Sequence, residues 1–588
     1  MIDKGRQLFV DDFLLEWSNA TRTFHQAIPR QVVLRPTAAE TVRQNTKFTY
    51  SMLGFHQIGT ARPFSGGVWY DECRKLFVIH YRCGYRFPKT GTGCVAFSED
   101  GRRWWRPRLH GARAARGSQS PPNRVNCAIE TESFTTWLDH SEANSSHRWK
   151  ALNGRPASAS GKMLLWSSPD GIHWAPFVQH NQRRRSASTG QGTDRASFFY
   201  DAFRSKWVFS LRENLCRGGH GHLRISRFKE VASLRSSNWK DWVSSYFQCG
   251  EEGVESGRPA RWAGVDQWDC EGHDVEACEL YHLDATPYES LLIGQFGVLY
   301  PGFAHGGCKI TYLHAAFSRD GFHWSRPDAS ESEPRRRLVK DNLGLVYQQP
   351  IAGNMLVVGD EIYVYYGGAS SCRRCNHNPT MTQGSAAPRV PNKTLDFCLE
   401  GDAKHDGPVA PEESSMEELT ALAVLRRDGF ASLSPPHKNS EVLVRTRVVQ
   451  FSHGAHLFVN VDAARGKLRV AIRLAESTEP LHPFTFGNSV PLQVNNTCVA
   501  VTWSGQPADG LAQLRNRRIK IEFLLRRSAR LYAFWVSPSL RGESGGFING
   551  PGAPGGIDSG GVLLEHTKRE GQGSSQCSAE NSQAVPSP

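Results

Sequence analysis

Four copies of one short signature punctuate this chain and constrain its fold more than any other feature. The first three are Ser98–Trp104 (SEDGRRW), Ser168–Trp174 (SPDGIHW) and Ser318–Trp324 (SRDGFHW), and the fourth is the shortened Arg427–Phe430 (RDGF). Asp-Gly favours the left-handed backbone of a two-residue hairpin turn, so the flanking Ser and Trp are predicted to lie on the paired strands. A hairpin that recurs along a chain is typical of a propeller or a repeat array.

A second set of turns gives the number of repeats. The signature aspartates lie at 100, 170, 320 and 428, and the step of 150 residues in the middle corresponds to two repeats of about 75. Strand–turn–strand segments carry a turn aspartate at Asp71, Asp139, Asp201 and Asp360, and the strand Tyr288–Phe296 fills the gap in that set. Five units therefore run from about residue 63 to about 433, which predicts an all-β chain with a five-bladed β-propeller at 61–435.

Four further segments are predicted besides the strands of the blades. Residues 1–60 contain the apolar run Gln7–Leu15 and are expected to form a strand and an extended segment that pack on the propeller. Residues 440–545 contain six apolar strands at sandwich-like spacing, which predicts an accessory β-sandwich. A polar insertion is predicted at about 371–415 in the last blade, and a disordered tail rich in Gly, Ser, Pro and Gln at 546–588.

Composition excludes some classes of function and leaves one question open. No run of about 18 apolar residues is present, so no membrane span is expected. The net charge of +13 is concentrated in runs such as Arg183–Arg185, but no nucleic-acid motif accompanies it, so nucleic acid is not an expected partner. The charge fits either solvated loops or an anionic ligand such as a sulfated or uronic polysaccharide.

The cysteines and the glycosylation sequons favour the secretory route, although the first residues show no apolar signal-peptide core. The chain has 14 cysteines, and acceptor sequons begin at Asn19, Asn144, Asn392 and Asn495. Cys372 and Cys375 stand close to Cys398 and His377, but one close pair with scattered partners favours a local disulfide or free thiols over zinc. Neither a metal nor a cofactor is predicted.

Several motifs resemble a known family. Residues 62–71 (RPFSGGVWYD), the repeated hairpins, residues 193–201 (TDRASFFYD), Tyr288-Glu289 and residues 425–432 (LRRDGFAS) resemble a group of secreted proteins of planctomycete-type bacteria. That group is similar to the arabinanase, levansucrase and invertase superfamily of five-bladed propeller glycosidases. The resemblance covers nearly all of residues 6–545. It implies a glycosidase-like site at one end of the central tunnel, whereas fold alone does not fix an activity.

Glycosidases need two carboxyl groups that flank the scissile bond, so carboxylates on the innermost strands are the catalytic candidates. Glu289 stands in an apolar stretch beside Tyr288, where burial would raise its pKa and suit it to general-acid work. The resemblance also implies a general-acid Glu on a late blade. Asp194 and Arg195 are predicted at the head of the innermost strand of the third blade and look like the Arg-Asp pair of the superfamily in reversed order, with Arg195 suited to bidentate binding of substrate oxygens. We expect Glu289, Asp194 and Arg195 to converge at one end of the tunnel.

The remaining candidates are less defined. Asn126 of the second blade and Arg212 of the third are expected to contact substrate, as is Tyr288. The resemblance implies a nucleophile or base at the head of the first innermost strand, but residues 62–67 contain no carboxylate, and the second catalytic carboxylate stays unassigned. Asp71 and the other turn aspartates are predicted to be structural because turn chemistry explains them.

The predicted function is therefore that of a glycoside hydrolase-like enzyme acting on a poly- or oligosaccharide, with an anionic saccharide among the candidate substrates. The alternative is a propeller that binds carbohydrate or acts as a scaffold without catalysis, and the missing carboxylate of the first blade is its best support. A lyase or another enzyme on the same fold, using Tyr288 or a His, is the third hypothesis.

Overall fold

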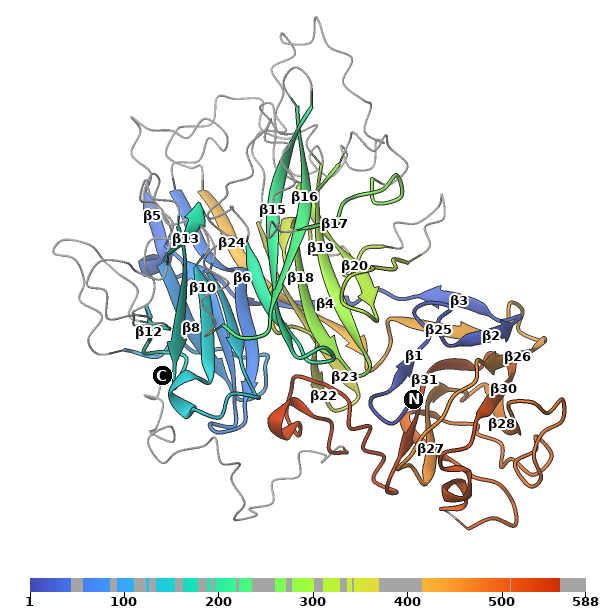
Figure 1. Cartoon of the computed structure of the whole chain (residues 1–588). Helices are drawn as coiled ribbons and strands as arrows, with labels where there is room; N and C mark the ends of the chain where they lie inside the picture. The colour runs from blue at the N-terminus through green and yellow to red at the C-terminus, as the bar shows by residue number, and fades with distance from the viewer. Residues whose placement is uncertain are drawn as a thin grey trace, which may run out of the picture.

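The computed structural model describes residues 1–43, 57–84, 92–109, 123–125, 134–153, 162–177, 188–191, 196–217, 221–234, 260–270, 278–300, 310–327, 336–340, 343–369, 415–507 and 509–560. Within these ranges the regular structure consists of β-strands and short 3₁₀ turns, with no α-helix. Figure 1 shows two bodies, a large fan of strands and a smaller orange and red one beside it. The predicted all-β fold class is confirmed.

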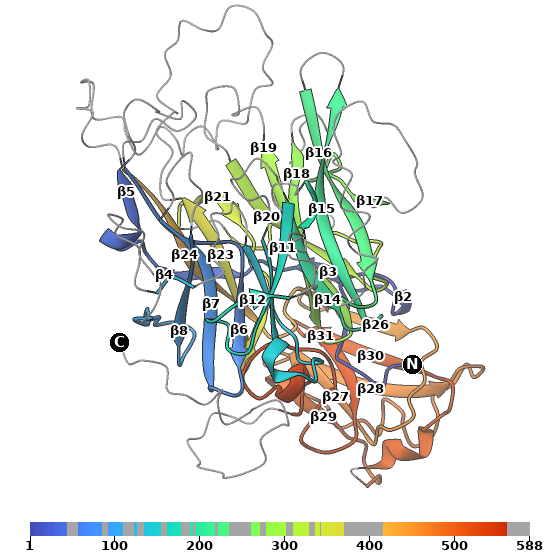
Figure 2. The same cartoon turned by 60° about the vertical axis from the view of Figure 1, so that its left-hand side comes forward.

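Five antiparallel strand groups follow one another along the chain and form the predicted blades. Each group starts at its innermost strand and continues outward through neighbouring strands, and Figure 2 shows the blades fanned out side by side. Blade one contains β6 (Gln57–Asp71), β7 (Leu76–Cys83) and β8 (Thr92–Ser98), and blade two contains β9 (Phe134–Leu138), β10 (Trp149–Asn153), β11 (Lys162–Ser168), β12 (Ala175–Pro176) and β13 (Ser188–Gln191). Blade three contains β14 (Ser197–Asp201), β15 (Lys206–Arg217), β16 (Gly221–Val231) and β17 (Ala260–Ala263), and blade four contains β18 (Glu279–Tyr288), β19 (Leu291–Tyr300) and β20 (Ile310–Ser318). Blade five contains β21 (Val346–Gln349), β22 (Leu356–Val358), β23 (Glu361–Ala369) and β24 (Ser415–Arg426).

Contacts between successive blades arrange the five groups in a ring. Each blade touches the next through a hydrogen bond or an aromatic pair, and the fifth touches the first. The contacts are the Trp69 indole donating to the Thr136 carbonyl, the Trp137–Trp207 ring pair, the Ser197 hydroxyl donating to the Leu283 carbonyl, the Gln295 amide donating to the Ile351 carbonyl, and the Val68 amide donating to the Ala352 carbonyl. We call the end of the ring at which the innermost strands β6, β9, β14, β18 and β21 begin the head end, and the opposite end the tail end.

The N-terminal segment completes the ring between the fifth and first blades. Strand β4 (Ile28–Leu34) pairs with β24, and β5 (Thr41–Arg43) pairs with β6. Strand β24 also pairs in parallel with the first residues of β6, so that Glu418 lies opposite Thr60. Residues 28–43 therefore pack on the propeller, and blades one and five form one continuous sheet.

The three complete Asp-Gly signatures form equivalent turns, each of which follows the end of a blade strand, β8, β11 or β20. In each turn the aspartate carboxylate accepts hydrogen bonds from the serine hydroxyl two residues before it and from backbone N–H groups two and three residues after it. The glycines Gly101, Gly171 and Gly321 have φ of 71°, 72° and 77°, as the turn requires. The turns are longer than the expected two-residue hairpins, because the nearest pairs across them are residues such as Phe97 and Trp105.

Two sheets that share one apolar core form the second body, which is the predicted β-sandwich. One contains β29 (Asn495–Val501), β27 (His456–Asp462), β31 (Arg530–Ser537), β25 (Ala431–Ser434), β3 (Thr21–Phe24) and β1 (Gln7–Leu8), and the other β2 (Leu15–Ser18), β26 (Glu441–Thr446), β30 (Ile519–Arg527) and β28 (Gly466–Leu474). Three of these strands come from the N-terminus, which was expected on the propeller instead. They are recruited because Phe9 packs against Phe523 and Phe534 in the sandwich core.

The chain after the sandwich packs back onto the propeller at its tail end. Residues 545–560 run in red beneath β22 and β23 in Figure 1. Ile548 and Ala553 are buried with apolar residues of blades four and five. Asn549 accepts a hydrogen bond from the Tyr70 amide and donates to the Val68 carbonyl. The first residues of the predicted disordered tail are thus packed structure, because a few apolar and amide side chains find partners on the blade ends. Residues 561–588 and the predicted insertion up to residue 414 lie outside the described residues.

Candidate functional site

Glu289, the predicted general acid, lies at the tail end rather than along an innermost strand. It occupies the turn between β18 and β19 with a φ of 52°, and its side chain is 0% exposed. Its carboxylate accepts hydrogen bonds from the Arg6 amide at 3.1 Å, the Ser544 hydroxyl at 2.6 Å and the Arg427 guanidinium at 3.1 Å. Partners from the propeller, the N-terminus and the C-terminal segment therefore surround Glu289, and its observed position differs from the expected one.

We call the charged side chains around this turn the junction network. Its members are Arg6, Glu289, Arg427, Asp428 and Asp558, all buried. Burial and the nearby Asp558 raise the pKa of Glu289. Burial also opposes the charge of Asp428, but Arg6 and Arg427 outweigh it and lower the pKa of that carboxyl. Tyr288 donates to Asp428 at 2.8 Å, so this predicted substrate contact is another partner of the network. The network joins the domains and offers a substrate no access.

The other predicted residues divide between the head end and the part of the chain that is not described. Asp194, Arg195 and Asn126 lie outside the described residues, and so their expected convergence with Glu289 stays a prediction. Arg212 is described on β15, beyond the residue that pairs with the first residue of β14. It therefore lies at the head end, and its guanidinium is 5.2 Å from the ring centroid of Tyr281.

At the head end the backbone of β6 leaves regular pairing and brings side chains together. The register between β6 and β7 shifts between Arg62 and Gly67. Phe64 and Ser65 have φ of 45° and 62°, a left-handed conformation that costs free energy outside glycine. The Phe64 ring lies between two cations, 4.7 Å from the Arg62 guanidinium and 4.4 Å from that of Arg82. Strained backbone of this kind is typical of functional sites.

Two tyrosines extend this cluster to blades five and four. Tyr347 of blade five, with a φ of 56°, lies 4.8 Å from the Arg62 guanidinium. Its hydroxyl is 3.3 Å from that of Tyr281 on blade four, and Tyr281 in turn contacts Arg212 of blade three. A continuous chain of contacts thus joins four blades at the head end. We call Arg62, Phe64, Arg82, Arg212, Tyr281, Tyr347 and Glu418 the head-end cluster.

Glu418 supplies a carboxylate to this cluster. It pairs with Arg62 at 2.9 Å, and the two side chains are 6% and 2% exposed. The second carboxylate oxygen, Oε2, is buried without a hydrogen-bond partner among the residues that the structure describes. The same holds for Oγ1 of Thr60, the register neighbour of Glu418, and for Oγ of Ser65. Buried oxygens of this kind are costly unless they meet a polar partner, so their grouping suits a ligand rich in hydroxyl groups.

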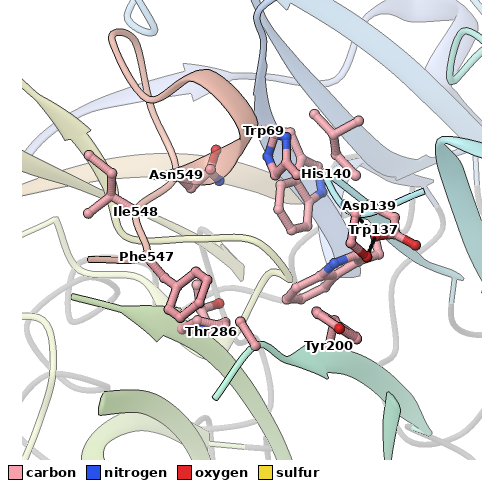
Figure 3. Close-up of a pocket in the computed structure, with 15 residues that line it drawn as sticks. Trp69, Trp137, Asp139, His140, Tyr200, Thr286, Phe547, Ile548 and Asn549 are labelled. Carbon is pink, nitrogen blue, oxygen red and sulfur yellow. Dashed lines mark hydrogen bonds between the residues drawn. The ribbon is translucent and has the colours of Figure 1, made fainter. Parts of the chain in front are cut away.

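The tail end holds a different cavity, of about 140 Å³, shown in Figure 3. The rings of Trp69 and Trp137 are 4.6 Å apart and lie on one side, with Tyr200 near them, while Phe547 of the C-terminal segment lies across the cavity. Two polar groups at its border are bonded within the protein, since the Trp69 indole donates to Thr136 and Asp139 pairs with Lys150, whereas the Thr286 hydroxyl is buried without a hydrogen-bond partner among the described residues. This cavity under the C-terminal segment is therefore mostly, but not wholly, apolar.

Neither a metal cluster nor a membrane helix is present in the described part of the chain. No group of three His, Cys, Asp or Glu side chains is placed to hold a metal there. None of the helices described is long and apolar enough to cross a membrane.

Sequence reasoning missed most of the head-end cluster. Arg62 was noted only because a carboxylate was absent from residues 62–67, and Glu418 is 356 positions away from it in the chain. The parallel pairing of β24 with β6 brings the two together, and no local pattern announces a pairing of that kind. The Arg in the place of the implied carboxylate was the one signal that could have prompted a search for its partner.

Comparison with known proteins adds likeness of fold at low similarity. No family model matches the chain, and no curated relative matches it. Solved structures that are similar include a β-fructofuranosidase from Schwanniomyces occidentalis complexed with fructosyl-erythritol, at 10% identity and TM-score 0.34, covering 87% of this chain and 97% of that one. A family 43 arabinoxylan arabinofuranohydrolase from Bacillus subtilis has 9% identity and TM-score 0.28, covering 86% and 99%. An N-acetylgalactosamine deacetylase from F. plautii has 12% and 0.32, covering 73% and 96%. At these TM-scores the likeness decides nothing about activity, which has to be argued from this chain's own residues.

Proposed function

We propose that this protein is a glycoside hydrolase-like enzyme that binds an anionic oligo- or polysaccharide at the head end of its propeller. The observation that carries the proposal is Glu418, a buried carboxylate with one oxygen held by Arg62 and the other without a partner among the described residues. It lies opposite Thr60 at the head of the first blade, where the family resemblance implies a carboxylate and residues 62–67 contain none. Strand β24 supplies the missing group from the neighbouring blade.

In this mechanism Glu418 acts as the nucleophile or base, fixed by the bond to Arg62. A glycosidase needs a second carboxyl group on the other side of the scissile bond. Asp194, which stands three residues before the first residue of β14, is our candidate for that group, with Arg195 and Asn126 as substrate contacts. Because all three lie outside the described residues, their roles rest on sequence alone.

The arginines of the head-end cluster favour an acidic sugar. A guanidinium binds a carboxylate or sulfate through two parallel N–H bonds, which a neutral hydroxyl cannot match. Arg82 and Arg212 are each stacked on an aromatic ring, Phe64 and Tyr281, so their planes are oriented before ligand binds. A uronate or a sulfated sugar is the substrate class that this arrangement fits.

The test is an activity screen on purified full-length chain. Oligosaccharides of galacturonate, glucuronate and sulfated galactose are supplied beside neutral xylo- and fructo-oligosaccharides, and new reducing ends are measured. Glu418→Gln is expected to lower turnover of a responsive acidic substrate at least 100-fold, within the usual range for loss of a catalytic proton-transfer group. Glu417→Gln is the matched control, because Glu417 is the next residue in the chain and its carboxylate pairs with Arg35 on the surface.

Unchanged turnover in a folded Glu418→Gln variant would sink the catalytic role of this residue. Thermal unfolding of the two variants shows whether lost activity reflects lost structure, since removing one partner of a buried ion pair costs about 3–5 kcal/mol. A substrate preference for neutral over acidic oligosaccharides would contradict the anionic specificity.

The alternative function is carbohydrate binding without catalysis. One observation favours it: Arg62 occupies the strand position where a carboxylate is implied and engages one oxygen of Glu418. A binding protein would show affinity for acidic oligosaccharides by calorimetry with no reducing ends released by the wild-type chain. Glu418→Gln would then change affinity only.

We also propose that the protein folds on the secretory route. Two disulfides support this, Cys83–Cys94 between β7 and β8 and Cys270–Cys278 before β18, since such bonds persist in oxidising compartments. Expression in an oxidising compartment should give a chain in which these four cysteines are alkylated only after reduction, while the free Cys498 reacts without it. Full alkylation of Cys83 and Cys94 without reduction would contradict the proposal.

A further inference from the structure

A second large depression lies where blade five, the N-terminal segment and the sandwich meet. This junction groove has a volume of about 790 Å³. One wall comes from strands β24 and β4 of the propeller, another from β31 of the sandwich, and a third from residues 337–340 after blade four. Residues of the N-terminal segment, Phe24 to Arg30, run between them. The groove is thus an interdomain surface separate from the head-end cluster.

Positive charge dominates the groove. Five of its lining residues are basic: Arg30, Arg337, Lys340, Arg426 and Arg530. Arg30, Lys340 and Arg530 are exposed. Arg426 is held in place by neutral groups, the amide oxygens of Asn460 at 2.9 Å and Asn495 at 2.6 Å and the ring of Tyr532 at 4.8 Å. A fixed guanidinium beside exposed cations is an arrangement that attracts and orients anions.

The two acids of the groove do not neutralise these cations. Glu361 pairs with Arg102 of blade one at 3.1 Å. Asp360 accepts a hydrogen bond from the Thr497 hydroxyl. In the described part of the chain, Arg30, Lys340, Arg426 and Arg530 form no ion pair with a carboxylate. The electrostatic character of the groove is therefore positive.

His25 does not add to this charge at neutral pH. Burial, together with the nearby Arg530, lowers its pKa to about 4. Its ring lies against Tyr532 and hydrogen-bonds the Ser432 hydroxyl. His25 therefore belongs to the uncharged floor of the groove, with Phe24 and the exposed Ile28 as its apolar rim.

We propose that the junction groove is a second binding site for an anionic oligosaccharide, which holds a polymer by its carboxylate or sulfate groups. The cations supply the anion contacts, and Ile28 and Phe24 give the sugar rings apolar surface to cover. Carbohydrate, rather than another polyanion, is inferred from the proposed function at the head end. The site itself follows from the shape and charge of the groove.

The experiment is calorimetry at two salt concentrations with four probes. These are galacturonate oligosaccharides, sulfated galactose oligosaccharides, neutral xylohexaose and a single-stranded DNA oligomer. The triple variant Arg30→Gln, Lys340→Gln, Arg530→Gln removes three exposed charges without touching the core. Lys75→Gln, Arg518→Gln, Arg541→Gln is the matched control, because it removes the same charge from other exposed positions.

We expect the groove variant to bind the acidic oligosaccharides about tenfold more weakly, with a smaller salt dependence, while the control changes by less than about twofold. Whichever of the two acidic probes binds more tightly identifies carboxylate or sulfate as the preferred group. Wild-type affinity in the groove variant overturns the proposal. DNA binding as tight as that of both acidic sugars, and equally reduced in the variant, also overturns it in favour of a nucleic-acid surface.

The two proposals can fail independently. In a chain with Arg82→Met and Arg212→Met, which weakens the head-end site, the second binding event at the groove should remain. Conversely, the groove variant should keep turnover of short substrates within about twofold, since none of its residues belongs to the head-end cluster. If both binding events disappear with either variant, the groove is not a separate site and the inference is wrong.

Discussion

The two ends of the propeller are built from the same innermost strands, yet their chemistry is opposite. The head end brings together Arg62, Arg82 and Arg212 with two tyrosines and leaves buried oxygens without partners among the described residues. At the tail end the charged groups are enclosed in the junction network, and the remaining cavity is mostly apolar and lies under the C-terminal segment. The charged groups of the tail end thus lie enclosed between the domains, whereas those of the head end are the ones to which the proposed function assigns a ligand.

The comparison explains why an enclosed cavity and a buried carboxyl with a raised pKa are poor guides to function here. A raised pKa in a buried carboxyl is a frequent mark of a catalytic acid. For Glu289 the same shift arises from burial and from Asp558 within a structural network. Ion-pair networks between domains produce such shifts as readily as active sites do.

The largest expected effect is at the tail end. Arg427→Met leaves Glu289 and Asp558 without the guanidinium they share at 3.1 and 3.0 Å, and should lower the free energy of unfolding by about 3–5 kcal/mol. Urea denaturation measures the change. Arg526→Met is the control, because its partner Glu441 is exposed and the pair should contribute about 1 kcal/mol or less. Equal effects of the two substitutions would show that the network does not hold the domains together.

The next largest expected effect is on ligand affinity, and it distinguishes the head end from the tail end. Arg82→Met and Arg212→Met should each weaken binding of an acidic oligosaccharide by about 1.5–3 kcal/mol, the range for a hydrogen bond to a charged group, and leave neutral oligosaccharides unaffected. Ile548→Ala at the tail end should instead reduce stability by about 2–5 kcal/mol and keep the affinity. Titration calorimetry and thermal unfolding distinguish these outcomes. A loss of affinity in Ile548→Ala would mean that ligand binds at the tail end.

Local sequence patterns predicted the propeller well because its blades are made from local hairpins. The Asp-Gly turns at Asp100, Asp170 and Asp320 bond their own following amides, so their structure is determined within a few residues. The same patterns could not predict which domain receives strands β1 to β3. Their partners are hundreds of residues away, and Phe9 joins the sandwich through packing that no local pattern records.

The site was harder to predict than the fold for the same reason. The apolar neighbours of Glu289 predict a buried carboxyl, and the structure shows one. Its role in the fold, however, follows from its partners Arg6, Arg427 and Ser544. They come from three distant segments of the chain. The Arg62–Glu418 pair is equally non-local. The residue types marked these positions as candidates for a functional site, whereas their actual roles depend on contacts that only the folded chain makes.

A smaller effect should appear between blades one and two as the pH falls. Burial lowers the pKa of His80 to about 4, and its ring donates to the Gly171 carbonyl and contacts the Thr136 hydroxyl. The unfolded chain takes up this proton near pH 6.5 and the folded chain does not, so stability decreases as the pH drops from 6.5 towards 4. Between pH 6.5 and 5 the loss is about 1.6 kcal/mol.

Urea denaturation at several pH values measures this slope, and His80→Gln should reduce it by the share of one proton, because burial also lowers the pKa of His25 and of His140 to about 4. His323→Gln is the control, because that histidine is exposed on a turn. If wild type and His80→Gln lose stability in parallel below pH 6.5, the proton uptake belongs to another group.

The smallest effect concerns the outer turns, which belong to neither end. Asp320 accepts hydrogen bonds from the Phe322 and His323 amides, both at 2.8 Å, and its carboxyl has a pKa lowered to about 2 although burial opposes the charge, because His323 and these amides outweigh it. Asp320→Ala removes these bonds at a half-exposed site where water can replace them, so the loss of stability should be about 1 kcal/mol at neutral pH. A depressed folded pKa stabilises the fold above the unfolded value of 3.8, and therefore the difference between variant and wild type should shrink as the pH falls from about 4 towards 2. Turnover and oligosaccharide affinity should not change. A clear loss of either would place the signature turn in the working site and end the distinction between structural and ligand-binding charge on which the comparison of the two ends rests.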